Sequence, residues 1–111
     1  MKITSPYLLF TALLFSIGLS GQKLMVLGTL QDAGSPQLLC EKECCAYPKP
    51  NDYVACLGVI DSTRALLFDA TPDIVPQLSE LLARSGTDRF SIFLTHAHMG
   101  HYTGLIHLGR E

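Results

Sequence analysis

Three histidines lie within six residues of one another, at His96, His98 and His101. They follow directly on an apolar run at residues 90–94 that has the character of a β-strand. If the strand continues, His96 and His98 project to the same side, because side chains two residues apart share a face. Gly100 then allows a sharp turn that brings His101 back toward them. Since imidazole is the commonest metal ligand among side chains, this spacing predicts a metal site rather than three unrelated surface histidines.

Three further polar residues need an interpretation beside the histidines. Asp69 ends a predicted strand, and two roles stay open for it. It would either orient a metal-ligating histidine or stand at the start of a helix, stabilised by the helix N-terminus. Asp32 is typical of a turn. His107, six residues after His101, is expected to be a structural or surface residue rather than a ligand.

The chain has four cysteines, at Cys40, Cys44, Cys45 and Cys56. Disulfides, a small structural zinc site and unpaired thiols all remain open interpretations. Adjacent cysteines rarely pair with each other, so the sterically easier disulfides join Cys44 and Cys45 to Cys40 and Cys56. The usual C-x-x-C spacing of a zinc site is absent.

The elements that position these residues follow from the hydrophobic pattern. Residues 23–30 predict a first strand that is apolar enough to be buried on both faces. Residues 31–52 predict a long loop, which the cysteines within it would hold in place. Residues 53–60 and 64–69 flank a tight turn at residues 61–63, and together they predict a β-hairpin.

A helix is predicted after the hairpin, from one apolar stripe at Ile74, Leu78, Leu81 and Leu82. Thr71 or Asp73 would cap its start, and Gly86 stands where a left-handed terminating residue belongs. The next strand is expected at residues 90–95, and a second helix is expected to begin at residues 105–108. This order of elements predicts an α/β sheet with the site at the strand ends.

The first 21 residues have the pattern of a secretory signal peptide. Lys2 forms a short positive region, residues 7–19 are apolar, and Ser20 and Gly21 are small. The apolar span is shorter than the roughly 20 residues of a membrane-spanning helix, so no stable membrane insertion is expected after cleavage. The protein is thus expected to be exported, either periplasmic or secreted, which permits disulfides.

Charge excludes one class of partner. The formal net charge is -2, and it becomes -3 when Lys2 is removed. The sequence has no basic stripe, so it gives no support for binding nucleic acid. The remaining residues, 22–111, are enough for one small domain.

The segment His96-Ala97-His98-Met99-Gly100-His101 resembles the H-x-H-x-D-H motif of the metallo-β-lactamase superfamily. In that family the motif ends a strand that follows a β-β-α-β lead-in like the one expected here. Residues 26–29 and 31–37 resemble the N-terminal signature of the pyrroloquinoline quinone biosynthesis protein B branch. The resemblance implies an α/β fold, the N-terminal half of a metallo-β-lactamase αβ/βα sandwich. Residues 22–111 would then be a partial domain, apparently an N-terminal fragment.

The resemblance also implies roles for individual residues. His96 and His98 correspond to ligands of the first metal, and His101 to a ligand of a second metal or an alternative ligand. Gly100 stands at the motif's aspartate position, so that ligand does not carry over and a single divalent metal, zinc foremost, is expected. Asp69 corresponds to an aspartate that closes a strand in the family.

Two functions follow from the resemblance. The first is a metal-dependent hydrolase of a small-molecule substrate, whose site is incomplete in this chain. The second is a non-hydrolytic binding or accessory protein for a quinone-type ligand, related to pyrroloquinoline quinone biosynthesis or transport. In either case the missing C-terminal half-domain would leave one face of the sheet exposed to water, and an apolar patch of that size normally signals an absent partner.

Overall fold

The computed structural model describes residues 21–47 and 49–109. The segment 1–20, and with it the expected signal peptide, lies outside the described residues. Among the described residues, no helix is both long and apolar enough to cross a membrane. The elements in chain order are β1 (Lys23–Gly28), α2 (Glu43–Ala46), β2 (Cys56–Asp61), β3 (Arg64–Phe68), α3 (Ile74–Ser85), β4 (Phe90–Phe93) and the 3₁₀ turns η1 (Met99–His101) and η2 (Thr103–Leu108).

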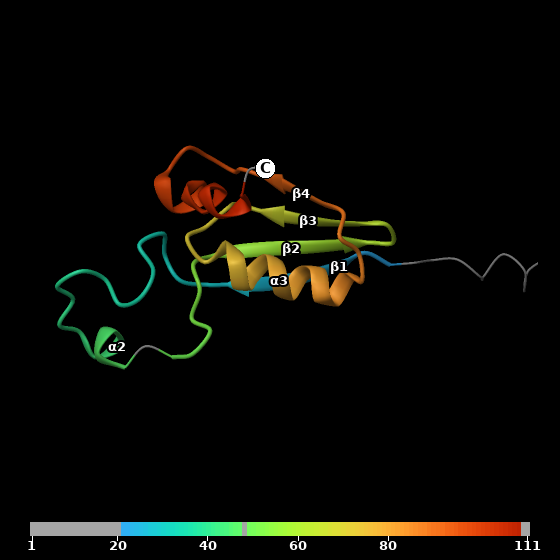
Figure 1. Cartoon of the computed structure of the whole chain (residues 1–111). Helices are drawn as coiled ribbons and strands as arrows, with labels where there is room; N and C mark the ends of the chain where they lie inside the picture. Colours follow the sequence, from blue (N-terminus) through green and yellow to red (C-terminus); the bar gives the residue numbers. More distant parts are fainter. Residues whose placement is uncertain (1–20, 48, 110–111) are drawn as a thin grey trace, which may run out of the picture.

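The four strands form one sheet in the order β1-β2-β3-β4 (Figure 1). β1 pairs antiparallel with β2, β2 pairs antiparallel with β3, and β3 pairs parallel with β4. β1, β3 and β4 therefore run in the same direction. Their carboxyl ends meet at one edge of the sheet, where the segments that follow them can approach one another.

The hairpin and the main helix agree with the prediction from sequence. β2 and β3 are joined through Ser62 and Thr63, with Asp61 paired to Arg64. In α3 the predicted apolar stripe faces the sheet: Ile74 and Leu81 are fully buried. Gly86 is left-handed (φ 67°) and its N–H donates to the carbonyl of Leu82 at 3.0 Å, as its position after the helix predicts.

The start of α3 differs from the predicted cap. Asp73 is the N-cap residue, but its side chain makes no capping hydrogen bond. Its carboxylate instead accepts a hydrogen bond from the backbone N–H of Val54 at 2.9 Å, which joins the helix start to the segment before β2. Thr71 Oγ1 accepts from the N–H of Asp73 at 3.1 Å. These side chains therefore hold loops together rather than extend the helix.

The sheet is covered on one face only. α3 lies across one face of the sheet (Figure 1), and the core forms between the two. It comprises Leu27, Cys56, Ala65, Leu67, Ala70, Ile74 and Leu81. Strand residues that point the other way stay open to water, with Leu24 67% and Val26 65% exposed. The prediction that β1 is buried on both faces is therefore wrong, because in the described part of the chain no second layer packs on that side.

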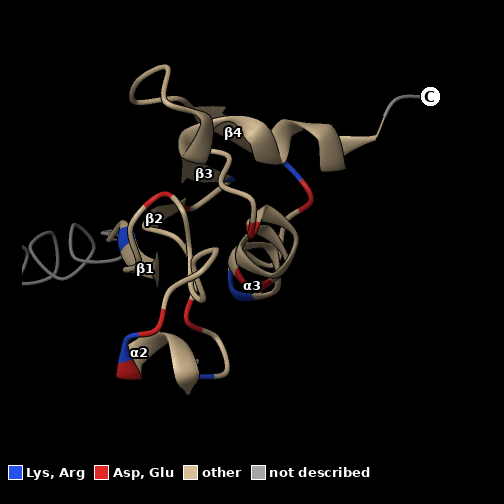
Figure 2. Ribbon diagram, turned by 90° about the vertical axis from the view of Figure 1, so that its left-hand side faces the viewer, with Lys and Arg blue, Asp and Glu red and all other residues tan. Residues whose placement is uncertain are grey.

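The open face is largely apolar across the sheet. Beyond β1 it continues through Leu57, 41% exposed, and Phe93, 54% exposed. Charged residues on the strands occur only at strand ends, and Figure 2 shows most charges in the loops and helices instead. In the described part of the chain this face is open to water, and an exposed apolar face of this kind is typical of an interaction surface.

The long loop after β1 contains the short helix α2 and one disulfide. Cys40 pairs with Cys45, and Cys44 is an exposed free thiol. Cys56 is a free thiol buried in β2, so of the three alternatives left open for it the structure agrees with the unpaired thiol and not with a disulfide or zinc site. Its side chain points into the core beneath α3 and cannot meet the other three. At the other end of the chain, the segment expected to begin an α-helix forms the 3₁₀ turn η2.

Candidate metal centre

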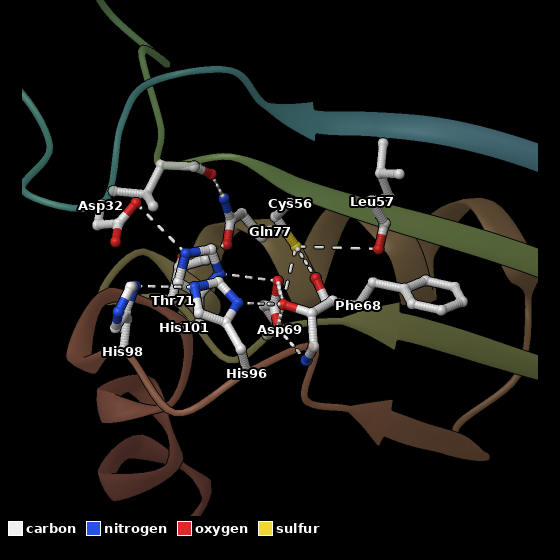
Figure 3. Close-up of polar contacts among 12 residues, drawn as sticks. Asp32, Cys56, Leu57, Phe68, Asp69, Thr71, Gln77, His96, His98 and His101 are labelled. Atoms are coloured by element: carbon white, nitrogen blue, oxygen red, sulfur yellow. Dashed lines mark hydrogen bonds and ion pairs between the residues drawn. The ribbon is translucent and has the colours of Figure 1, made fainter.

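The candidate site lies at the edge where β1, β3 and β4 end. Asp32 comes from the loop after β1, Asp69 follows β3 directly, and the three histidines follow β4. Figure 3 shows these side chains pointing toward one another from the three segments. Backbone hydrogen bonds fix the arrangement: Ala70 N–H donates to the carbonyl of His101 at 2.8 Å, and Asp69 N–H donates to that of Phe93 at 2.7 Å.

The three histidines lie close together, with His96 next to both of the others. Nε2 of His96 lies 3.0 Å from Nδ1 of His98, and the ring centres of His96 and His101 are 4.1 Å apart. Strand alternation does not explain this, because β4 ends at Phe93. The histidines instead lie on the loop after β4 and on η1, which returns His101 to the other two.

Asp69 is the buried anchor of the cluster. Its carboxylate accepts hydrogen bonds from the N–H of Thr95 at 2.7 Å, from Thr95 Oγ1 at 2.9 Å and from Nδ1 of His101 at 2.8 Å. Its backbone is left-handed (φ 73°), a conformation that aspartate tolerates better than most residues. The alternative role at a helix start is wrong, because Asp73 precedes α3 and Asp69 bonds to the histidine segment.

Asp69 also sets which ring nitrogens are free. Nδ1–H of His101 donates to Asp69, which leaves Nε2 of His101 to face the centre of the cluster. The hydroxyl proton of Thr95 is donated to Asp69, so Oγ1 accepts from Nδ1–H of His96 at 2.9 Å. Nε2 of His96 is then also left with its lone pair. The carboxylate thus prepares two histidines as ligands, one directly and one through Thr95.

The charges in the site support this network. Burial would raise the pKa of Asp69, but hydrogen bonds from Thr95 and His101 outweigh it and hold the pKa below its ordinary value. The hydrogen bond to Asp69, with the charges of Asp69 and Asp32, raises the pKa of His101 against the opposing effect of burial. Asp69 is therefore an anion at neutral pH, and it attracts positive charge to the histidines.

Asp32 is the site residue that the sequence did not reveal. Its carboxylate lies 3.3 Å from Nε2 of His101, and it is half-exposed, at 49% of the side chain. Asp32, His96 and His98 have ligand atoms within 4.8 Å of one another, close enough to hold one ion. A hydrogen bond from its own backbone, with the charge of His101, lowers the pKa of Asp32.

The donor set fits a divalent metal. Ligand nitrogens on a tetrahedral zinc ion lie about 3.3 Å apart. The 3.0 Å between His96 and His98 and the 3.3 Å between His101 and Asp32 agree with that spacing. Imidazole and carboxylate donors suit zinc and other divalent first-row metals alike. Asp32, His96 and His98 therefore have ligand atoms close enough to hold a divalent cation, and His101 lies beside them.

A buried polar network supports the loop behind the site. Gln77 in α3 donates from Nε2 to the carbonyl of Val54 at 2.7 Å, and its Oε1 accepts from the hydroxyl of Thr71 at 2.6 Å. Gly104 in η2 then packs directly on this loop, where an added Cβ would lie 2.8 Å from the carbonyl oxygen of Ala70. The loop that carries Asp69 therefore packs between α3 and η2.

Two other candidate residues lie outside the cluster. His107 is exposed on η2, and it is not part of the group of described residues whose ligand atoms lie close enough to hold an ion. The thiol of Cys56 donates to the carbonyl of Phe68 at 3.3 Å, and burial, with the nearby charge of Asp69, raises its pKa to about 12. Cys56 is therefore a protonated core residue at neutral pH and not a metal ligand.

Comparison with solved structures identifies the type of fold. A crystal structure described as a new diphosphatase from the PhnP family matches with a TM-score of 0.61 and 28% sequence identity. PhnP-family proteins have the metallo-β-lactamase fold. The fold of this chain is of the same type. The match covers 78% of this chain but only 34% of that structure's chain. No protein-family model matches the sequence, and no curated protein matches it either.

Proposed function

We propose that this chain carries the metal-binding part of a hydrolase of the metallo-β-lactamase type. The observation that carries the proposal is the convergence of His96, His98 and His101 at the strand ends, with Asp69 fixing their orientation. The likeness to a diphosphatase suggests the substrate class, a small molecule with a diphosphate linkage. Zinc is the proposed metal.

The residues have separate roles in this proposal. A bound divalent cation would polarise the scissile bond and activate water for attack. His96, His98 and His101 would hold the cation, while Thr95 and Asp69 keep the ring nitrogens of His96 and His101 oriented. The half-exposed Asp32 leaves the cluster open on its solvent side, where substrate would enter.

We propose further that the centre is completed by a second half-domain. The apolar sheet face, which includes Leu24, Val26 and Phe93, is the surface it would cover. In this proposal residues 22–111 are a partial domain of an exported protein, and additional metal ligands come from the covering half. The span of 34% of the related structure's chain supports a longer functional unit.

Metal analysis of the purified chain is the first test. After zinc loading and desalting, elemental mass spectrometry is expected to find metal bound to the wild type and little bound to His96→Ala. His107→Ala, which alters an exposed histidine outside the cluster, is the matched control and is expected to keep the metal. A metal-free wild type would overturn the site, and equal metal in His96→Ala would move it to other residues.

The hydrolase assignment needs its own measurement. Because the proposed centre is completed by a second half-domain, cleavage is measured on zinc-loaded protein that includes that half. It is expected to hydrolyse a dinucleoside diphosphate at a rate that falls to background in His96→Ala. If zinc is bound but no zinc-dependent cleavage occurs, the hydrolase assignment fails and the non-hydrolytic alternative gains support.

That alternative is a binding or accessory protein for a quinone-type ligand. The observation that favours it is Gly100 at the position of the motif's aspartate. It predicts that pyrroloquinoline quinone binds the chain, measurable by the quench of tyrosine fluorescence, and that binding survives removal of metal by a chelator. Absence of saturable binding would exclude this alternative.

A further inference from the structure

Gly100 and Asp32 are in direct contact although they lie far apart in the sequence. A Cβ atom added to Gly100 would overlap the Cβ of Asp32 and lie 2.8 Å from both its Cα and its carbonyl oxygen. Real Cβ atoms essentially never approach other atoms so closely. Asp32 therefore occupies the space into which a side chain at position 100 would extend, and it allows only glycine there.

The carboxylate of Asp32 points into the histidine cluster. Its Oδ1 lies 3.3 Å from Nε2 of His101, the nitrogen that Asp69 leaves free. Figure 3 shows the carboxylate across from the rings of His98 and His101. The ligand atoms of Asp32, His96 and His98 fall within 4.8 Å of one another.

The backbone around Asp32 is fixed by the sheet edge. Leu30 forms a parallel bridge with Val54, and its carbonyl accepts from the N–H of Ala55 at 2.8 Å. One residue later, Gln31 begins a turn in which its carbonyl accepts from Gly34 N–H at 2.8 Å. Asp32 lies inside this turn, so the position of its side chain is set by β1 and not by the long loop beyond.

We propose that Asp32 is a metal ligand that replaces the missing aspartate of the H-x-H-x-D-H pattern. The carboxylate comes from the loop after β1 and lies beside His101. Gly100 is then the complement of Asp32 and not a sign of a lost ligand. The proposal rests on the proposed metal function, and it adds one anionic donor to three neutral imidazoles.

Moving the carboxylate back provides a direct test. Gly100→Asp alone is expected to destabilise the protein, because the new side chain overlaps Asp32. The double variant Asp32→Gly with Gly100→Asp removes the overlap with the Cβ of Asp32 and returns the carboxylate to the motif position. The contacts with the Cα and carbonyl oxygen of residue 32 remain, so the turn at residue 32 has to shift to accept it. Asp32→Asn removes the charge at nearly constant shape, and Asp88→Asn, an exposed residue in the turn before β4, is the matched control.

Zinc affinity is measured by competition with a chromophoric chelator, with zinc-induced shifts in Tm as a second readout. Asp32→Asn is expected to lower affinity by at least about tenfold. The double variant should recover most of that loss, and Asp88→Asn should match the wild type. Circular dichroism of the metal-free proteins checks that each variant is folded.

The outcomes separate this proposal from the proposed function. If the wild type binds no zinc, both fail. If the wild type binds zinc, His96→Ala does not, and Asp32→Asn binds as tightly as the wild type, the metal site stands and the role of Asp32 is overturned. If Asp32→Asn loses affinity and the double variant is as folded as the wild type but recovers none, the carboxylate is not interchangeable between the two positions, and the replacement is overturned.

Discussion

Nδ1 of His101 lies 2.8 Å from Oδ2 of Asp69, and the same carboxylate accepts two hydrogen bonds from Thr95. This contact joins the end of β3 to the segment after β4. It also leaves Nε2 of His101 free to face Asp32. The orientation of the candidate metal site therefore depends on one buried acid outside the histidine motif.

Asp69→Asn tests that dependence. An amide at this position places a donor against Nδ1–H of His101 or against the Thr95 donors, so one hydrogen bond is lost. We expect the free energy of unfolding to fall by about 2 kcal/mol and zinc affinity to fall about 10- to 100-fold. Urea unfolding and chelator competition measure the two effects. Unchanged zinc affinity in a folded variant would show that Asp69 does not orient the ligands.

Thr95→Val tests the path from Asp69 to His96. Valine keeps the shape but removes the hydroxyl that bonds both Asp69 and Nδ1 of His96. Zinc affinity is expected to fall about tenfold, while Thr95→Ser, which keeps the hydroxyl, stays close to the wild type. Equal losses in both variants would point to packing of the threonine methyl group instead of the hydrogen bonds.

Gln77→Leu tests the buried network behind the site. Leucine leaves the carbonyl of Val54 and the hydroxyl of Thr71 without their partner, which costs about 1–3 kcal/mol of unfolding free energy. Glu80→Ala, which breaks an exposed pair with Arg84 on the same helix, should cost less than about 1 kcal/mol. Denaturant unfolding compares the two variants, and a smaller loss for Gln77→Leu would contradict the network.

The two free cysteines should differ in reactivity and in their effect on stability. Cys44 is exposed, whereas burial raises the pKa of Cys56 to about 12. An alkylating reagent at pH 8 is expected to modify Cys44 within minutes and Cys56 only after unfolding, as read by mass spectrometry. In the unfolded chain Cys56 ionises near its ordinary pKa of 9.0. The protonated thiol therefore contributes fully to the free energy of unfolding below pH 9, and this contribution is lost as pH rises toward 12.

The pH effect has its own control. Cys56→Ala removes the titrating group, so between pH 9 and pH 12 its Tm should fall less steeply than that of the wild type. Parallel Tm curves would show that Cys56 does not contribute to the alkaline loss of stability.

Local patterns in the sequence predicted much of the fold. The hairpin and α3 depend on neighbours a few residues apart, as in the stripe from Ile74 to Leu81, so periodicity alone reveals them. The exposure of Leu24 and Val26 was not predictable from β1, because it depends on which faces of the sheet other elements cover. The sequence also located the histidines, although the loop and η1, and not strand alternation, bring them together.

Asp32, Thr95 and Gln77 escaped the sequence interpretation for different reasons. Asp32 follows β1 and contacts His101, which follows β4, so the contact joins segments far apart in the sequence. Aspartate is also common in turns, so its residue type gave no sign of a role in the site. Threonine is common in and next to strands, so the residue type of Thr95 gave no sign of a role in the site. Gln77 did leave a signal, since a polar residue three positions after Ile74 interrupts the buried face of α3.

X-ray absorption at the zinc edge of the zinc-loaded chain tests the central claim most directly. Three histidines and Asp32 predict a first shell of nitrogen and oxygen at about 2.0–2.1 Å, with outer scattering from imidazole rings. His107→Ala, which alters a histidine outside the cluster, should leave that imidazole scattering unchanged. A shell of sulfur at about 2.3 Å would place the metal on the cysteines and contradict the account.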